Sequence, residues 1–440
     1  MPSLDRDILR LAVPALGALV AEPLFLLTDT ALVGHLGETP LAGLGVASTL
    51  LQTAVGLLIF LAYATTPAVA RRLGAGDRPG AIKAGIDGMW LALAIGVALA
   101  LVAWPLAGPL VGLFNSTGAV SAEAVTYLTI SLIGLPGMLV VIAATGLLRG
   151  LQDTRTPLVV AVAGFAANAA LNAVLIYGAG WGIAGSAAGT VLAQWGMAAV
   201  YVVMAVRAAR ASGVPLRPGV VGVSGAALAG GWLLLRTASL RAALVGSVIV
   251  ASSLGVTELA AFQIALTVYS TLAFILDALA IAGQALIGHG LGASEVARVH
   301  AVTRRLIRWG LGAGVVLGVL VAVAAPFAGP VFSSSPAVQQ AVTATLLTMA
   351  IGIPLAGFVF VLDGVLIGAG DARYLALAGL ITLVAYLPLL IAVELVHPPG
   401  TAGLVWLWLA FGLGYIGARA LTLGLRARGS RWIVTGAPAR

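Results

Sequence analysis

Apolar residues dominate this chain in runs of about 20 residues that recur from end to end. A helix rises about 1.5 Å per residue, so each run is long enough to cross a hydrocarbon core of about 30 Å. Segments of about ten alternating residues, which are typical of transmembrane β-barrels, are not visible. The pattern therefore predicts an all-α integral membrane protein with twelve transmembrane helices. The expected spans lie near 8–33, 41–70, 81–112, 121–148, 156–178, 182–207, 224–252, 259–288, 298–326, 338–366, 372–396 and 402–425.

The composition excludes an ordinary soluble domain. Of the 440 residues, 61% are apolar and 9% are charged, whereas an ordinary soluble domain carries roughly 25% charged residues. A chain with so few charges could not cover its own surface in water.

The formal charge of +8 reports orientation and does not indicate a nucleic-acid partner. Basic residues fall in alternate connections between the expected spans, which is the positive-inside pattern. The basic side holds Arg6, Arg10; Arg71, Arg72, Arg78, Lys83; Arg149, Arg155; Arg207, Arg210, Arg217; Arg298, Arg304, Arg305, Arg308; Arg373; and the tail from Arg419 to Arg440. The connections 34–40, 113–121, 179–181, 253–258, 327–337 and 397–401 contain no Lys or Arg. We therefore expect a multi-pass protein of the inner (plasma) membrane with both termini in the cytoplasm.

The first apolar stretch is predicted to stay as the first helix. It follows Asp5, Arg6 and Asp7 directly and lacks the short apolar region and cleavage site of a signal peptide. Cysteine is absent, which excludes disulfides, thiolate metal sites and cysteine catalysis.

An internal repeat divides the chain. Four blocks match, in order, at one constant spacing, which is hard to obtain by chance even in a Gly/Ala/Leu-rich sequence. We call this spacing the repeat offset; it carries Leu36 onto Leu254. The blocks are Leu36-Gly37 with Leu254-Gly255, Leu73-Gly74-Ala75 with Leu291-Gly292-Ala293, Ile133-Gly134-Leu135-Pro136 with Ile351-Gly352-Ile353-Pro354, and Gly150, Asp153, Arg155 with Gly368, Asp371, Arg373.

The repeat predicts two lobes of six helices each. The expected parts are an N-lobe at 1–210, a cytoplasmic linker at 211–223, a C-lobe at 224–425 and a basic cytoplasmic tail at 426–440. Because the repeat offset spans an even number of helices, both lobes enter the membrane in the same orientation. Parallel repeats of this kind suggest alternating access by rocking of two bundles.

Specific residues then resemble a known family. The run Ala21-Glu22-Pro23-Leu24 followed by Thr28-Asp29-Thr30-Ala31-Leu32-Val33-Gly34-His35-Leu36-Gly37 resembles the first-helix signature of MATE (multidrug and toxic compound extrusion) transporters, most closely of the DinF-like branch. Further similarity lies at Leu148–Arg155, at Asn168-Ala169-Ala170-Leu171-Asn172 and at Asp363-Gly364. The resemblance covers essentially the whole chain. It implies efflux of amphipathic, often cationic compounds in exchange for H⁺ or Na⁺.

Asp29 and Glu22 are the first candidates for a transport site. They lie seven residues apart and therefore share one face of the first helix. Pro14 and Pro23 each delete a backbone hydrogen bond in that helix and favour a hinge. Because burial favours the neutral form of a carboxyl group, proton uptake is expected to change the helix shape. The alternative is that Asp29 only caps or pins the outer end of the helix.

The resemblance places Asp29 at the proton-coupling aspartate of the family's N-lobe. It places Asn168, Asn172 and Thr190 where hydrogen-bonding partners are found. Some relatives carry a second aspartate at the position of Asn172, and an amide there cannot ionise. This departure puts a relay of two carboxylates in doubt and leaves Glu22 as the second acid. For Asn168 and Thr190, simple hydrogen bonding between helices is the alternative.

The second half holds a cluster of Asp277, Asp363, Arg236 and Arg241. Arg236 and Asp277 are expected at similar depth, where an ion pair would make both tolerable in the membrane. The resemblance implies cation binding by acids of this lobe. The nearby arginines instead favour a structural ion pair over a Na⁺ site.

The sequence does not predict an enzyme, a bound metal or a cofactor other than the coupling ion, H⁺ or Na⁺. It has a single lysine and no Gly-Lys-Ser/Thr phosphate loop, so ATP is not the expected energy source. The four histidines, which fall near helix ends, lack metal-ligand spacing. They are His35, His289, His300 and His397.

The rival function is a flippase for a lipid-linked saccharide or another lipid. Such a protein is expected to line its cavity with several basic residues for a diphosphate, and here only Arg236 and Arg241 are available. A secondary active multidrug exporter is favoured. Its expected partners are small amphipathic organic substrates and membrane lipid, with no nucleic acid, and the protein is expected to be a monomer.

Overall fold

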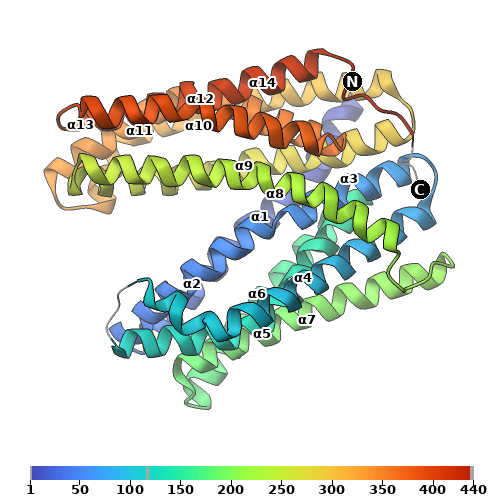
Figure 1. Ribbon diagram of the computed structural model, residues 1–440, viewed down its shortest axis with the longest axis horizontal. Coiled ribbons are helices and arrows are strands. Elements are labelled where there is room, and N and C mark those ends of the chain that lie inside the picture. Colours follow the sequence, from blue (N-terminus) through green and yellow to red (C-terminus); the bar gives the residue numbers. More distant parts are fainter. Residues whose placement is uncertain (1, 115–117, 437–440) are drawn as a thin grey trace. The chain divides into compact units, whose positions relative to one another are not determined.

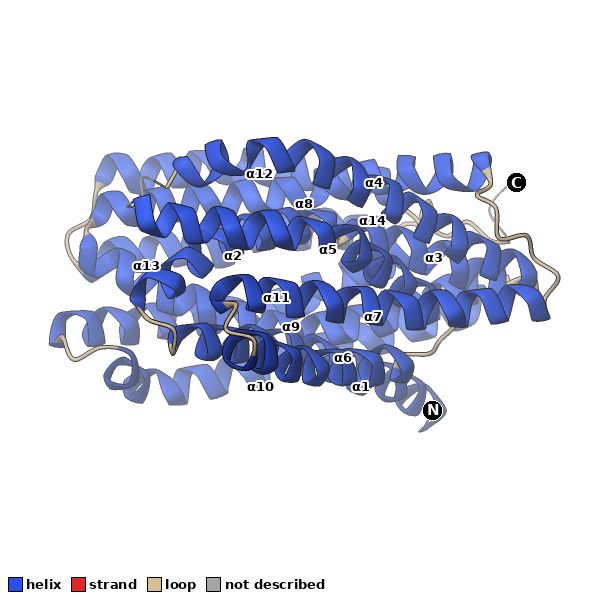
Figure 2. Cartoon of the chain, turned by 90° about the horizontal axis from the view of Figure 1, so that it is seen from below, coloured by secondary structure: helices blue, strands red, loops and turns tan. Residues whose placement is uncertain are grey.

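The computed structural model of the chain describes residues 2–114 and 118–436. Long helices joined by short loops account for this part of the chain, which contains no strand (Figures 1 and 2). The elements are α1 (Pro2–Gly34), α2 (Glu38–Leu58), α3 (Phe60–Gly74), α4 (Arg78–Gly112), α5 (Gly118–Gly150), α6 (Arg155–Ala173), η1 (Val174–Gly178), α7 (Gly182–Ala211), α8 (Val220–Leu254), α9 (Val256–Gly292), α10 (Val296–Phe332), α11 (Pro336–Gly368), α12 (Ala372–Val396), α13 (Thr401–Leu409), η2 (Ala410–Tyr415) and α14 (Ile416–Arg428). η1 and η2 are short π-helical segments.

Twelve segments of the described residues are long and apolar enough to cross a membrane. The shortest has 24 residues, which as a helix covers the hydrocarbon core of about 30 Å. Three spans combine adjacent elements: α2 with α3, α6 with η1, and α13 with η2 and α14. The predicted all-α, twelve-span membrane fold is confirmed.

The helix bounds follow the repeat offset found in the sequence. α2 and α3 together run over 38–74 and α9 over 256–292, which is the same interval moved by the repeat offset. α5 and α11 are related in the same way. Gly37 and Gly255 precede α2 and α9 with φ of 126° and 144°, a backbone region that favours glycine. Each glycine therefore sets the sharp entry into its helix.

The close helix contacts repeat as well. A Cβ atom at Gly96 of α4 would lie 2.5 Å from Cα of Pro136 in α5, and a Cβ atom at Gly314 of α10 would lie 2.7 Å from Cα of Pro354 in α11. The repeat offset carries the first pair onto the second. Small residues allow helix backbones to approach in this way within a membrane.

The described chain divides into two packing units. The N-terminal unit comprises residues 13–230 together with Gly436, and the C-terminal unit comprises residues 2–12 together with 231–435. In the N-terminal unit α5 packs against α2, α3, α4 and α7, and in the C-terminal unit α11 packs against α9, α10, α13 and α14. Residues 437–440 of the predicted basic tail lie outside the described residues.

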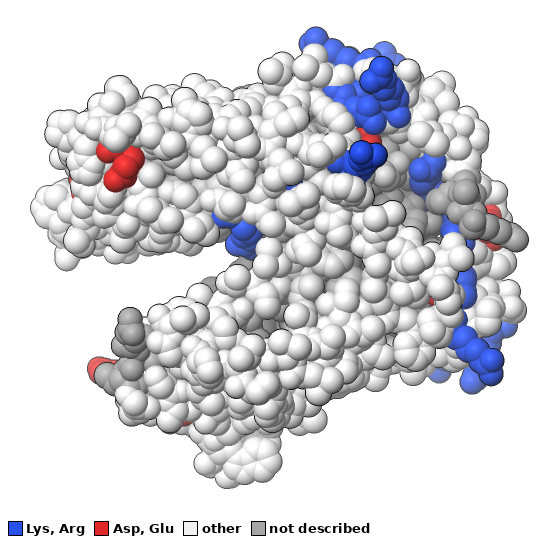
Figure 3. Space-filling model, viewed as in Figure 1, with Lys and Arg blue, Asp and Glu red and all other residues white. Residues whose placement is uncertain are grey.

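Charged side chains are unevenly placed within each unit. On the face shown in Figure 3, most visible Lys and Arg side chains gather at one end of the helices of each unit. The long middle parts of the helices are almost free of charge on that face. This is the distribution that a membrane span requires, because charge is costly in the hydrocarbon core.

Candidate functional site

In the N-terminal unit, a buried carboxylate accepts hydrogen bonds from three side chains. Asp29 of α1 is 4% exposed. Its Oδ1 accepts from Asn172 Nδ2 at 2.8 Å and from the Ser186 hydroxyl at 2.6 Å, and its Oδ2 accepts from the Tyr127 hydroxyl at 3.1 Å. An ionised carboxylate only accepts hydrogen bonds, so these donors match its charged form.

A second layer of hydrogen bonds orients the amide. Asn172 Nδ2 also donates to Asn168 Oδ1 at 3.2 Å, and Asn168 Nδ2 donates to Thr190 Oγ1 at 3.0 Å. All three side chains are buried. The Asp29 network therefore consists of Asp29, Asn172, Ser186 and Tyr127, with Asn168 and Thr190 behind them.

Helical spacing explains how four helices supply these groups. Asn168 and Asn172 are four residues apart on α6, and Ser186 and Thr190 are four residues apart on α7, so each pair shares one helix face. Packing holds α1 against α6, because Phe25 stacks on Phe165 with ring centroids 4.9 Å apart.

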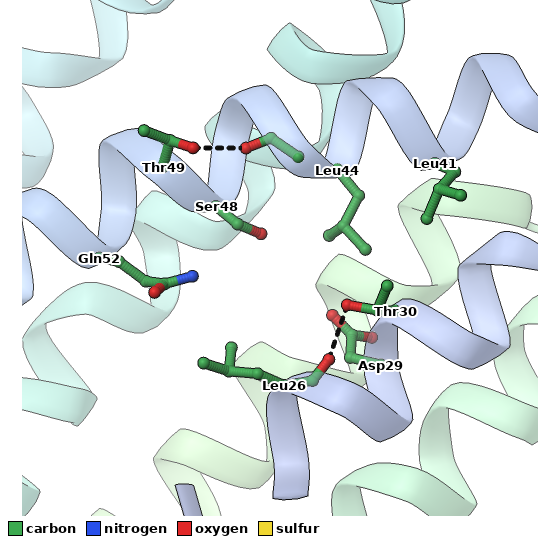
Figure 4. Close-up of a pocket in the computed structure, with 9 residues that line it drawn as sticks. Leu26, Asp29, Thr30, Leu41, Leu44, Ser48, Thr49 and Gln52 are labelled. Carbon is green, nitrogen blue, oxygen red and sulfur yellow. Dashed lines mark hydrogen bonds between the residues drawn. The ribbon is translucent and has the colours of Figure 1, made fainter. Parts of the chain in front are cut away.

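A cavity opens beside Asp29 between α1 and α2. Its volume is about 230 Å³, and Figure 4 shows Asp29 and Thr30 on one side with Ser48 and Gln52 facing them from α2. The lining residues are Leu26, Asp29, Thr30, Leu41, Leu44, Gly45, Ser48, Thr49 and Gln52. The Thr30 and Thr49 hydroxyls donate to backbone carbonyls of their own helices. The cavity thus combines an apolar wall, neutral polar groups and one carboxylate.

The structure does not bring Glu22 into the Asp29 network. Glu22 lies on α1 with an exposed side chain and takes no part in the hydrogen bonds that surround Asp29. Pro14 and Pro23 both lie inside the continuous helix α1. Each removes one backbone hydrogen bond from that helix, because proline has no N–H.

The C-terminal unit contains a buried ion cluster around Asp363 of α11. Arg236 of α8 and Arg419 of α14 both pair with this carboxylate, Arg419 Nη2 at 2.6 Å from Oδ1. Arg419 Nη1 also donates to the Leu375 carbonyl at 3.3 Å. Two guanidinium groups on one carboxylate repel cations, so the cluster is poorly suited to bind Na⁺.

The other two residues predicted for this cluster occupy different surroundings. Arg241 of α8 is exposed. Asp277 of α9 is partly buried and has an interaction of its own. The expected pair between Arg236 and Asp277 stays a prediction, whereas the pair between Arg236 and Asp363 is present.

The charge pattern placed Arg419 on the same side of the membrane as the basic tail. The structure places it 4% exposed within the helix bundle. Arg419 also lies within the last expected span, 402–425, where a helix packed in the bundle is expected. Arg426 and Arg428 follow it in the last turn of α14.

Tyr127 and Ser186 are further site residues that the sequence did not predict. Ser186 had a usable signal, since it lies one helical turn from Thr190 on the same face. Tyr127 had none beyond a lone hydroxyl in an apolar span. Among the described residues, no group of three or more His, Asp or Glu side chains could hold a metal ion.

Comparison with known proteins decides the family. A family model described as MatE matches residues 14–174 and 243–391, which together form most of the chain. The chain belongs to the MATE family. MATE proteins are transporters, so this membership supports a multidrug-type transporter of the membrane.

Relatives match most of the chain. DETOXIFICATION 44, chloroplastic, of Arabidopsis thaliana is 32% identical over 387 residues, which cover 84% of this chain and 73% of that protein. DNA damage-inducible protein F of Escherichia coli (strain K12) is 26% identical over 388 residues, covering 84% and 82%. This similarity agrees with the predicted DinF-like resemblance.

Solved structures show the same fold. The Vibrio cholerae MATE transporter VcmN in its bent form superposes with a TM-score of 0.88 at 21% identity, covering 98% of this chain and 99% of that chain. At this identity the comparison establishes the fold alone.

Proposed function

We propose that this MATE protein is a secondary active exporter that exchanges amphipathic, cationic organic compounds for protons by alternating access. The protein would work as a monomer in the inner (plasma) membrane with both termini in the cytoplasm. The observation that carries the proposal is the Asp29 network, because it places an ionisable group in a buried site beside a cavity.

Proton uptake at Asp29 would rearrange hydrogen bonds across four helices. The ionised carboxylate accepts from Asn172, Ser186 and Tyr127. A protonated Asp29 carries an O–H donor, and a donor cannot face another donor. At least one partner must then turn away or reverse its role. Because the partners lie on α5, α6 and α7, protonation changes how α1 is held by its neighbours.

Asn172 is suited to serve both protonation states. Its Oδ1 is buried and has no hydrogen-bond partner among the described atoms. An amide has a donor and an acceptor of similar shape, so a rotation of the amide would present Oδ1 to a protonated Asp29. The Asn172 amide cannot ionise as a second carboxylate would. Its oxygen can still accept a hydrogen bond from protonated Asp29.

The cavity chemistry supports a cationic or neutral amphiphile as cargo. Leu26, Leu41 and Leu44 provide apolar contact, and Asp29 provides the charge near the wall. A cation in this cavity would be attracted to ionised Asp29 and released when Asp29 takes up a proton. Exchange of proton for substrate at one carboxylate is sufficient for antiport.

The network favours H⁺ over Na⁺ as the coupling ion. Three donors already approach the Asp29 oxygens, and one of them is an amide N–H, which cannot coordinate a cation. A diphosphate-carrying lipid is also disfavoured. Arg236 and Arg419 are both engaged with Asp363, so they do not form a free basic site.

Efflux of ethidium from proteoliposomes under separately imposed pH and Na⁺ gradients tests the proposal. The pH gradient alone is expected to drive efflux, and Asp29→Asn is expected to abolish it. Glu38→Gln is the matched control, since Glu38 is an exposed acid at the start of α2. Efflux that follows only the Na⁺ gradient would overturn proton coupling, and unchanged efflux by Asp29→Asn would remove Asp29 from the mechanism.

A further inference from the structure

Two helices, α1 and α8, begin in one packing unit and continue in the other. The boundary lies between Ala12 and Val13 in α1 and between Gly230 and Gly231 in α8. The repeat offset of the sequence carries the first boundary onto the second. Each unit therefore contains the first segment of a helix whose remainder belongs to the other unit.

The first segment of α1 is held on α10 within the C-terminal unit. The Arg305 guanidinium pairs with both carboxylate oxygens of Asp5 through Nε and Nη2. The Trp309 indole donates to Asp5 Oδ1 at 2.8 Å. An exposed pair between Asp7 and Arg298, 3.6 Å apart, adds a contact between the same two helices.

The start of α8 is held on α4 within the N-terminal unit. Asp87 is 4% exposed, pairs with Lys83 and accepts from the Gly219 backbone N–H at 2.8 Å. The Trp90 indole donates to the Leu216 carbonyl at 2.9 Å.

Gly222 lets α8 approach this carboxylate closely. A Cβ atom at Gly222 would lie 2.1 Å from Asp87 Oδ2. The start of α8 therefore lies directly against Asp87.

The two attachments are equivalent in the repeat but opposite in charge. The repeat offset carries Asp87 onto Arg305, and it carries Asp5 onto Val223, the neighbour of Gly222. The first backbone N–H groups of α8 have no partner within the helix, so a carboxylate can accept hydrogen bonds from them. α1 carries the carboxylate of Asp5 in its first turn, and an arginine can pair with both of its oxygens. Each attachment thus uses the side chain that the first segment of its helix can bind, an acceptor for α8 and a donor for α1.

We propose that Arg305 and Asp87 are positioning residues that keep the first segments of α1 and α8 attached to their units throughout transport. Bending is then confined to the residues that follow each boundary. Pro14 lies just after the boundary in α1, and the pair Gly230 and Gly231 forms the boundary in α8. Proline and paired small residues are common sites of helix kinks. This inference rests on the proposed transport function.

Cross-linking tests whether the attachments ever open. The chain has no cysteine, so introduced thiols are the only ones present. A reducible bifunctional thiol reagent joins Asp7→Cys to Arg298→Cys, which leaves Asp5 and Arg305 in place. The same reagent joins Trp90→Cys to Leu216→Cys for α8. Single-cysteine variants treated in the same way are the controls.

Ethidium efflux by each cross-linked protein is expected to stay within about twofold of the same variant before cross-linking, a change of under about 0.5 kcal/mol in barrier. Efflux that falls at least about tenfold on cross-linking, and recovers when the cross-link is cleaved with a reducing agent, would show that the attachment must open. This result would overturn the proposal. Absence of efflux before cross-linking would count against the proposed function instead.

A spectroscopic readout does not depend on transport. Spin labels at positions 7 and 298 are expected to give one distance distribution that changes with neither pH nor ethidium. A second population that grows under either condition would show that the first segment of α1 detaches.

The role of Asp87 is tested by a conservative variant. Asp87→Asn keeps an acceptor for the Gly219 N–H and is expected to retain efflux within about threefold, whereas Asp87→Leu is expected to lose at least about tenfold. Amounts of reconstituted protein are matched. Equal loss in both variants would show that the charge alone matters, and would overturn the assignment of Asp87.

Discussion

The Asn172 amide donates to the Asp29 carboxylate at 2.8 Å, while the oxygen of the same amide is buried without a partner among the described residues. A buried, unsatisfied acceptor is uncommon and costs free energy unless another state uses it. A protonated Asp29 is the state that would use it. This relationship connects the hydrogen-bond geometry to proton exchange.

Asn172→Leu is expected to slow ethidium efflux by at least about tenfold, because it removes a donor for the ionised acid and an acceptor for the neutral one. Initial rates in proteoliposomes measure the effect. Gln52→Leu, on the cavity wall, is the comparison and is expected to alter the affinity for ethidium more than the maximal rate. Full efflux by Asn172→Leu would show that Asn172 does not take part in the exchange.

Ser186→Ala and Tyr127→Phe each remove one donor from Asp29. A hydrogen bond to a charged group contributes about 1.5–3 kcal/mol, so each variant is expected to transport measurably more slowly than the wild type. Asp29→Asn is expected to be slower than both. The order of initial rates is the measurement, and a single-donor variant that is slower than Asp29→Asn would contradict the central place of the carboxylate.

Asp363→Ala is expected to destabilise the fold. It would leave Arg236 and Arg419 without their shared carboxylate, and breaking a buried ion pair costs about 3–5 kcal/mol. A lower thermal unfolding temperature in detergent measures this loss. Asp29→Asn serves as the control and is expected to unfold near the wild-type temperature. An Asp363→Ala protein of normal stability that fails to transport would show that the cluster has a transport role.

Gly310→Ala is expected to destabilise the contact between α10 and α11. A Cβ atom there would lie 2.5 Å from the Gly357 carbonyl oxygen, so the two backbones would have to separate, at a cost of about 1–3 kcal/mol. Gly312, on the same helix, has open space around a Cβ atom. Gly312→Ala is therefore the matched control and is expected to unfold at or slightly above the wild-type temperature. Equal unfolding temperatures for both variants would contradict the close packing.

The twelve spans could be predicted because membrane crossing depends on length and hydropathy, which the sequence states directly. The connections were harder to place. The span expected at 41–70 is divided in the structure into α2 and α3, which meet at Ile59. The repeat offset was visible because it depends on identities such as Pro136 and Pro354, whose backbones touch equivalent glycines.

The candidate site could be predicted in part. Asp29 could be predicted because an ionisable group within a membrane span is a candidate functional residue. Asn168, Asn172 and Thr190 could be predicted because the family resemblance points to them, and the structure brings these four together. Tyr127 could not be predicted in the same way. Its contact with Asp29 depends on the rotation and register of α5 against α1, which hydropathy does not specify.

Buried charges outside the central site were the other difficulty. Asp87 and Arg419 lie near the ends of their spans, where a charge is ordinarily read as facing water. In the structure both are 4% exposed. Asp87 pairs with Lys83 one turn away on the same helix, which helical spacing alone could indicate. Its contact with the Gly219 N–H and the pairing of Arg419 with Asp363 join distant segments, so only tertiary packing reveals them.

The most direct test of the account is proton release from the purified protein when ethidium binds. Wild-type protein in weakly buffered detergent solution is expected to release protons on binding, and Asp29→Asn is expected to bind ethidium without releasing any. Proton release by Asp29→Asn equal to that of the wild type would contradict the claim that Asp29 exchanges its proton for substrate.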